Sequence, residues 1–340
     1  MSSYGQMATF QKRTQPSDAY VNTWLTDFSV GMVQKETAFV ASRVFPVRPH
    51  AQQTAEYLVY DMADWNRDSM KRRAPSTESE GDGFVFAPEP YYCPVYALHR
   101  DIDDQYRSNA ASPPIIVDQE TTRFLNLKNL IRREVSFASG FFTPGVWTNE
   151  VTGNAAAGAG QFVFWDDYVN STPIEDLRAG IQSVHLATGF KPNVLVLSAP
   201  VWAKLVDHPA ILDRVRAGQT PGGPAMVMRS DVAAILEIER IEVMDAVVNT
   251  ADVGMPAQNG YIGGEHAALF HVAPQLDLLS PSAGATFTWS GYPGANEDGV
   301  RITEMRLDLT KSDRFEIESS FVHKKTGDSL GYFFANALSP

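Results

Sequence analysis

The pattern of apolar and polar positions is most informative between residues 173 and 250. Apolar residues recur at helical spacing from Pro173 to Gly189, which predicts one helix. The apolar run at 194–197 predicts a strand buried on both faces, because a half-buried strand would alternate. Further helices are predicted over 201–206, 211–215 and 232–238, and a second strand over 241–244. Strands separated by helices predict an α/β layer with one central sheet.

Polar side chains stand where three of these helices begin. A hydroxyl of Ser171 or Thr172 precedes the first helix, Ser198 precedes the second and Asp231 the last. Oxygens of such side chains accept hydrogen bonds from the first N–H groups of a helix. We therefore expect side-chain caps at these positions.

Two extended arms around a charged tip predict a long hairpin. β-branched and aromatic residues dominate 44–60 and 84–98, whereas 61–83 is charged and carries the basic triplet Lys71, Arg72 and Arg73. A two-stranded ribbon alone is marginally stable in water, so a partner surface is implied. The basic triplet either meets an acidic neighbour or is a solvated tip, and exposed ion pairs contribute only about 0 to 1 kcal/mol each.

The longest helical pattern covers residues 115–142. Apolar residues from Phe124 to Phe141 form one side, and the other side carries Arg123, Lys128, Arg132 and Arg133. At 1.5 Å per residue such a helix spans roughly 40 Å.

The remaining segments predict strands, turns and a linker. Residues 143–161 are rich in Gly and Ala and predict a linker, and 277–300 predict a loop with many turn residues. Alternation predicts strands over 301–309 and 314–322, and a last strand over 331–334. Near the start, Trp24 and Phe28 belong to an apolar stripe that predicts a surface helix packed on the core.

Composition narrows the class of protein. The 340 residues suffice for several domains, and the net charge of −12 argues against nucleic acid as a specific ligand. The single cysteine, Cys93, excludes an internal disulfide and a cysteine-rich zinc site. The start lacks a signal-peptide core and no apolar run of about 18 residues occurs, so we expect a soluble protein made in the cytoplasm.

Catalytic motifs are missing from the sequence. It contains neither Gly-x-Ser-x-Gly nor His-Glu-x-x-His, and the glycine-rich 143–161 lacks the Gly-Lys-Ser/Thr of a phosphate loop. Cys93 falls in a predicted strand, where a thiol is inert. No catalytic residue, cofactor site or metal site is therefore predicted.

Several polar residues could be taken for metal ligands or acid–base groups, but an ordinary structural role explains them more simply. Asp101, Asp103 and Asp104 match a calcium loop poorly. His266 and His271 lie on opposite faces of a predicted strand and are poor co-ligands. Glu316 and Glu318 share one face of a strand, which we expect to be exposed.

The chain resembles the major capsid proteins of tailed bacteriophages, whose fold encapsulins share. The residues that carry the resemblance are Lys191-Pro192-Asn193 to Leu197, the helix over 201–206 and the turn His208-Pro209-Ala210-Ile211. Val44 to Val47 and Tyr96 to Leu98 resemble the two roots of that family's extended loop. The order of hairpin, long helix and α/β layer matches the family.

The resemblance implies an α+β capsid fold with five parts. They are an N-terminal arm (1–44), an extended β-hairpin loop (45–99), a peripheral domain with a long spine helix (100–150), an axial α/β domain (151–300), and return strands of the peripheral domain with a C-terminal strand (301–340). Contacts between subunits are expected at Trp24, Phe28, Lys71, Arg72, Arg73, Gly218, Pro221 and Gly222, with the loop 218–224 near the symmetry axis of a capsomer.

The implied function is that of a structural subunit of an icosahedral capsid, not an enzyme. Hexamers and pentamers of this chain would enclose double-stranded DNA without sequence-specific binding, in a virion assembled in the host cytoplasm. No long charged amino-terminal extension is present, so a separate scaffolding protein is expected. A portal is a further implied partner, a cement or decoration protein is compatible with the family, and no membrane is involved. The alternatives are an encapsulin-like compartment and an α/β enzyme.

Overall fold

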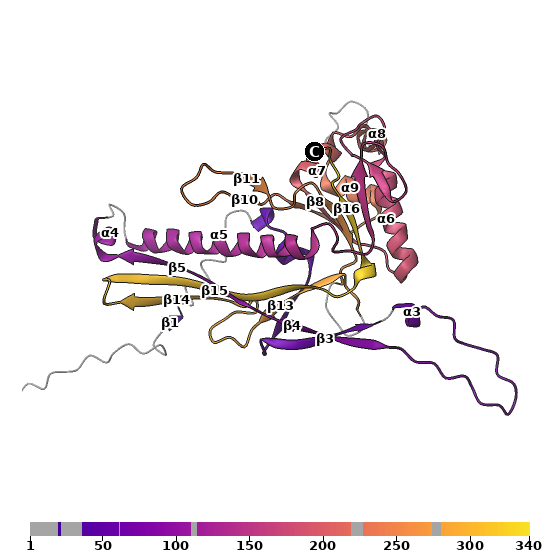
Figure 1. The fold of residues 1–340 in the computed structure, drawn as a ribbon, viewed down its shortest axis with the longest axis horizontal. Coiled ribbons are helices and arrows are strands. Elements are labelled where there is room, and N and C mark those ends of the chain that lie inside the picture. Colours follow the sequence, from indigo (N-terminus) through magenta and orange to yellow (C-terminus); the bar gives the residue numbers. More distant parts are fainter. Residues whose placement is uncertain (1–19, 22–35, 61, 110–113, 219–226, 274–279) are drawn as a thin grey trace, which may run out of the picture.

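The computed structural model describes residues 20–21, 36–60, 62–109, 114–218, 227–273 and 280–340, and it is built around two six-stranded sheets (Figure 1). The first, which we call the long sheet, is organised by β15, because β15 pairs with β14, β5 and β13. Its strands are β1 (Tyr20–Val21), β2 (Val47–His50), β5 (Val95–Asp103), β13 (Gly284–Trp289), β14 (Val300–Leu307) and β15 (Ser312–Lys325).

The second sheet, which we call the compact sheet, has the order β7-β6-β16-β12-β8-β9. The two predicted strands of the α/β layer lie in one sheet, which confirms that expectation, and they pair in parallel, with Val194 of β8 opposite Arg240 of β9. The strands are β6 (Glu150–Asn154), β7 (Gln161–Val163), β8 (Val194–Ser198), β9 (Arg240–Met244), β12 (Ala267–Phe270) and β16 (Gly331–Ala335).

Helices cover both faces of the compact sheet. Leu195 and Leu197 of β8 face a core shared with α6, α7, α8 and α9. Val194 and Val196 face the opposite core, to which α2 and the end of α5 contribute. This explains why the strand shows no alternation in sequence. The helices are α2 (Ala41–Val44), α6 (Pro173–Thr188), α7 (Ala199–Val206), α8 (Pro209–Gly218) and α9 (Arg229–Leu236).

The predicted long helix is α5 (Pro114–Phe141), which has 28 residues and packs along β15 and β5 of the long sheet. Two small ribbons project from this body in Figure 1, β3–β4 and β10–β11. The remaining elements are β3 (Thr54–Tyr60), α3 (Met62–Trp65), β4 (Phe86–Tyr92), α4 (Asp104–Asn109), β10 (Val247–Asn249), β11 (Asn259–Tyr261) and the 3₁₀ turns η2 (Glu36–Ala38) and η3 (Asp328–Leu330).

Two predicted caps are wrong and one acts differently. Thr172 and Ser198 occupy the positions before α6 and α7, but neither side chain forms a capping hydrogen bond. Ser171 instead donates its hydroxyl proton to the Asp167 carbonyl at 2.6 Å. Asp231 lies inside α9 rather than before it, and its carboxylate accepts from the Met228 N–H at 3.0 Å. Proline at the start of α6 and α7 already lacks one of the N–H groups that a cap would satisfy.

Two segments predicted as loops contain strands, of which β6 is half-buried and β13 is buried. The linker 143–161 contributes β6, in which a Cβ on Gly153 would lie 2.0 Å from the Asn336 carbonyl oxygen. The loop 277–300 contributes β13, in which a Cβ on Gly284 would lie 2.9 Å from Phe141. Glycine at these positions permits the close approach of neighbouring segments. A glycine-rich composition, taken alone, predicts a turn instead.

The predicted hairpin is present, but its second arm divides. β4 pairs with β3, whereas β5 leaves the hairpin and pairs with β15. The short segment 44–46 is also not extended throughout, because Val44 ends the helix α2. The hairpin thus joins the body at the turn between β4 and β5, and Cys93 lies in that turn rather than in a strand.

A stack of aromatic rings fixes the root of the hairpin. Tyr91 and Tyr57 lie on Phe287 of β13, with ring centroids 4.1 and 5.5 Å away. Tyr57 also donates its hydroxyl proton to the Lys325 carbonyl at 3.1 Å. Cys93 is fully buried beside them, and burial raises the pKa of its thiol to about 11. The rate at which the Cys93 thiol reacts therefore measures how well the aromatic stack keeps solvent out of the hairpin root.

We expect Tyr91→Ala to increase the rate at which a thiol reagent modifies Cys93 at pH 8 by at least tenfold. The substitution removes the ring that covers Phe287, and loss of a buried aromatic side chain costs about 3 to 5 kcal/mol. The wild-type thiol reacts slowly because only the thiolate is the nucleophile, and its ionised fraction is small at this pH. The rate is measured spectroscopically under native conditions.

Tyr92→Ala is the matched control, because Tyr92 is the next residue and is 56% exposed. Its rate should stay close to the wild-type rate. Equal rates for all three proteins would show that the aromatic stack does not close the root.

Candidate assembly surfaces

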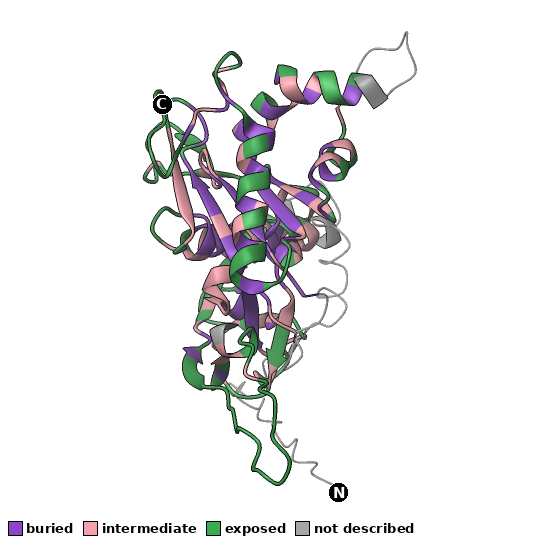
Figure 2. Cartoon of the chain, turned by 90° about the vertical axis from the view of Figure 1, so that its right-hand side faces the viewer, coloured by how far each residue is buried: buried purple, intermediate pink, exposed green. Residues whose placement is uncertain are grey.

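The distal part of the hairpin presents aromatic side chains to solvent. Trp65, Phe84 and Phe86 are 50%, 52% and 51% exposed. The Trp65 and Phe84 rings contact each other at 5.0 Å, and the Phe84 and Phe86 rings lie 6.5 Å apart. Figure 2 shows the distal loop as an exposed green ribbon that extends away from the purple sheets. We call these three residues the aromatic patch.

Charged residues surround the tip beyond this patch. Lys71 forms an ion pair with Glu80 across the loop, with Nζ and Oε2 2.6 Å apart. Arg72 and Arg73 are exposed. At the near end, the Asp64 carboxylate accepts from the Val85 N–H at 3.1 Å. One of the three predicted basic residues thus has a partner within its own chain.

The other predicted contact residues are placed only in part. Gly218 is the last residue of α8. Trp24, Phe28, Pro221 and Gly222 lie outside the described residues. The expectation that 218–224 lies near a symmetry axis therefore remains a prediction.

Two of the three aspartates that suggested a metal site belong to a network of ion pairs, and the third, Asp103, accepts from the Gln105 N–H at 3.3 Å. Asp101 accepts from Arg314 at 2.7 Å, and Asp104 pairs with Arg306, which also donates to Asp313 at 2.9 Å. These arginines lower the pKa of the Asp101 and Asp104 carboxyl groups. Within the described ranges, no group of three or more His, Cys, Asp or Glu side chains could hold a metal ion. The carboxylates fasten β5 and α4 to β14 and β15.

Three other polar residues singled out in the sequence also have local partners. The Asn336 N–H donates to His266 Nδ1 at 3.0 Å, and His271 Nδ1 donates to the Lys191 carbonyl at 2.8 Å. Glu318 is buried rather than exposed, which corrects the expectation for its strand face. Its carboxylate accepts from the Tyr292 hydroxyl at 2.6 Å and pairs with Arg301.

One serine–histidine contact was not expected from the sequence, because its members are 37 residues apart. Ser171 Oγ and His208 Nε2 are 3.0 Å apart and buried. The Ala210 N–H donates to His208 Nδ1 at 3.2 Å, so the proton of a neutral ring is on Nε2. His208 thus donates to Ser171, whose own proton goes to the Asp167 carbonyl. Because the ring nitrogen that faces Ser171 already carries the proton, it cannot accept the serine proton, and the pair does not form an activated nucleophile.

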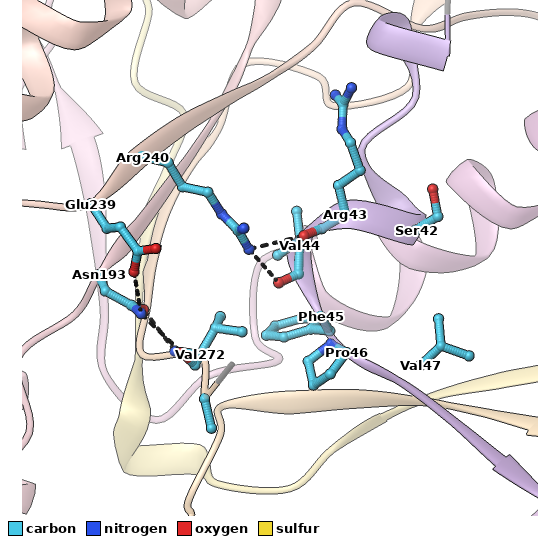
Figure 3. A pocket seen from close by; sticks show the side chains of 11 residues that line it. Ser42, Arg43, Val44, Phe45, Pro46, Val47, Asn193, Glu239, Arg240 and Val272 are labelled. Carbon is cyan, nitrogen blue, oxygen red and sulfur yellow. Dashed lines mark hydrogen bonds between the residues drawn. The ribbon is translucent and has the colours of Figure 1, made fainter. Parts of the chain in front are cut away.

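A cavity of about 400 Å³ lies where α2, β2 and the compact sheet meet (Figure 3). Arg240 of β9 reaches across it and donates to the carbonyls of Arg43 at 2.9 Å and Val44 at 3.3 Å. On the far side, Asn193 donates to Glu239 at 3.2 Å and to the Val272 carbonyl at 2.9 Å. The polar side chains at the cavity thus form hydrogen bonds with backbone carbonyls or with each other. The cavity is a seam between elements, with no nucleophile and base in contact among its lining residues.

None of the described helices has both the length and the apolar content that a membrane span requires. No protein-family model matches the chain, and a search among curated proteins finds no match.

Solved structures, in contrast, match nearly the whole chain. A phage-related protein from Bordetella bronchiseptica matches with a TM-score of 0.70 and 20% identity, over 95% of this chain and 99% of that one. The capsid of cyanophage P-SCSP1u matches with a TM-score of 0.56 and 10% identity, over 91% of both chains. The mature capsid of bacteriophage PhiM1 matches with a TM-score of 0.53 and 10% identity, over 98% of this chain and 93% of that one.

Each of these likenesses covers more than nine tenths of this chain, in agreement with the resemblance seen in the sequence. The identities are low, so they establish the fold and nothing finer. The chain has the α+β fold of phage major capsid proteins.

Proposed function

We propose that the chain is a structural subunit of a capsid shell. The observation that carries this proposal is the extended hairpin, whose distal part holds the aromatic patch outside both sheets. Solvated aromatic surface is costly, and burial contributes about 1.5 to 3 kcal/mol per large apolar side chain. A neighbouring copy that covers this patch would recover that free energy, and the matched capsid fold supports such a neighbour.

The geometry favours a head-to-tail contact between copies. The root of the hairpin is fixed by Tyr57 and Tyr91, whereas the aromatic patch lies at the other end of the ribbon. In the family that the chain resembles, the extended loop lies over the adjacent subunit, so we propose that this distal end meets a different surface of the next copy. Such heterologous contacts form closed rings when the rotation closes.

The finer parts of the proposal follow from the family resemblance. Rings of six and five copies would form the shell, with Gly218, Pro221 and Gly222 near their axes and Trp24 and Phe28 in an arm across a neighbour. The shell would enclose double-stranded DNA in a virion assembled in the host cytoplasm. A separate scaffolding protein, a portal and a cement or decoration protein would be its partners. The net charge of −12 fits a wall that encloses DNA without binding its sequence.

The first prediction concerns assembly of the purified chain. We expect closed shells, tubes or six-fold rings in negative-stain electron micrographs, with matching particle mass by light scattering. The size of the enclosed space separates a DNA-filled head from a compartment for an enzyme. A monomer or dimer that does not assemble even with a crowding agent would contradict the shell function.

The second prediction concerns the aromatic patch. Trp65→Ser combined with Phe84→Ser should abolish assembly, because the surface that a neighbour covers becomes polar. Both side chains are half exposed and their rings contact each other, so the free energy of unfolding of the unassembled chain should fall by about 1 to 3 kcal/mol and the chain should stay folded. Light scattering and thermal unfolding measure the two effects.

Val169→Ser is the control for the aromatic patch, since Val169 is 89% exposed and precedes α6 on the compact sheet. This variant should assemble like the wild type. Normal shells from the double variant would rule out the aromatic patch as a contact.

The third prediction distinguishes the two interpretations of the basic triplet. If Arg72 and Arg73 meet an acidic neighbour, Arg72→Glu with Arg73→Glu should raise the concentration needed for assembly by about tenfold at low salt, and less at high salt. Lys71 is left unchanged because it already pairs with Glu80. An unchanged assembly concentration at both salt levels would identify the triplet as a solvated tip.

A further inference from the structure

The short helix α2 is held at both ends by charged side chains from two different parts of the fold. At its start, Glu134 of α5 accepts from the Val40 N–H at 3.0 Å and from the Ala41 N–H at 2.9 Å. At its end, Arg240 of β9 donates to the carbonyls of Arg43 and Val44. The first N–H and last C=O groups of a helix have no partner within it, so these two side chains satisfy them.

Glu134 makes this attachment sensitive to protonation. Its side chain is completely buried, and Val40 and Ala41 are buried with it. Burial raises the pKa of Glu134 to about 7, although the two N–H groups and the Arg43 guanidinium act in the opposite direction. A carboxyl group in solvent ionises near pH 4.3, so the docked and the solvated states bind a proton with different affinity.

The charged groups around Glu134 are few and have other partners. Arg43, on α2, pairs with Glu242 of β9 at 3.1 Å. Arg133, next along α5, lies over the Phe321 ring at 5.1 Å. His323 of β15 packs against Phe137 of α5, and burial lowers the pKa of its ring to about 3, so the ring is neutral. The proton on Glu134 therefore governs the charge at the start of α2.

We propose that α2 is a pH-dependent latch, which stays docked on α5 while Glu134 is protonated and opens more often when that carboxyl group loses its proton. A protonated acid still accepts from the two N–H groups through its carbonyl oxygen, and no buried charge remains. An ionised Glu134 gains hydration when α2 moves away and water enters. The sign follows from the raised affinity for the proton: docking is strongest below pH 4.3 and weakens as the pH rises through about 7.

The position of α2 gives the latch its consequence. It precedes β2 and the hairpin along the chain and follows residues 36–38. Opening of α2 thus changes how the segment before Phe45 leaves the core, whereas Phe45 and β2 keep their contacts. The inference concerns the chain itself and holds whether or not the chain forms a shell.

Amide hydrogen exchange of the full-length chain tests the latch. Exchange of peptides covering residues 38–46 is followed from pH 5 to pH 8.5, corrected for the intrinsic rates and compared with peptides covering β12. Light scattering confirms one assembly state throughout. We expect the opening equilibrium of 38–46 to rise on the order of a hundredfold across this range, while β12 changes little.

Glu134→Gln should remove the pH dependence, because the amide keeps an acceptor and does not ionise. Glu120→Gln, on the exposed side of the same helix, is the matched control and should behave like the wild type. Arg43→Gln should shift the transition to higher pH, because it removes the cation that favours the ionised carboxylate. Opening of the wild type that is constant or falls with pH overturns the proposal, even if Glu134→Gln does not fold.

Discussion

A cluster of aromatic rings joins the two sheets into one body. Phe45 contacts Phe141 of α5 at 4.6 Å and Phe270 of β12 at 5.2 Å, and Trp147 lies 5.1 Å from Phe270. The rings thus connect the segment before the hairpin, the long helix and the compact sheet. Gly284 of β13 lies against the same rings, which brings the long sheet into the contact. Interiors pack as densely as organic crystals, so this cluster holds the two sheets in a fixed orientation.

Periodicity in the sequence was sufficient where a segment buries a continuous face. It gave α5, α6 and the pair β8 and β9, because these elements carry long apolar patterns of one period. Periodicity did not predict β6 and β13. Each of these strands contains a glycine because a side chain at that position would collide, in β6 with Asn336 and in β13 with Phe141. Such contacts join residues far apart in the chain, and composition cannot report them. The caps failed for a similar reason, since Ser171 found partners at Asp167 and His208.

The candidate surface was predictable in outline. Aromatic arms around a charged tip indicated a ribbon without a core of its own, and the structure places Trp65 and Phe84 in contact beyond the body. The sequence did not show that Lys71 would find Glu80, because both charges lie in a loop without periodicity. Nothing in the sequence indicated that Glu134 would be buried and would bind the start of α2. It stands in a helical pattern with cations nearby, and the N–H groups that it binds are more than 90 residues away.

The latch and the hairpin are mechanically connected through a short piece of chain. Val44 ends α2, Phe45 enters the aromatic cluster, and β2 begins at Val47 and pairs with β13. Phe287 of β13 supports the hairpin root. Apolar contacts such as those of Phe45 do not change with pH, whereas the charge on Glu134 does. The hairpin root therefore keeps its place when α2 opens, and the motion is confined to the segment before Phe45. A shell built from such subunits could hold its hairpin contacts while its amino-terminal segments respond to the proton concentration.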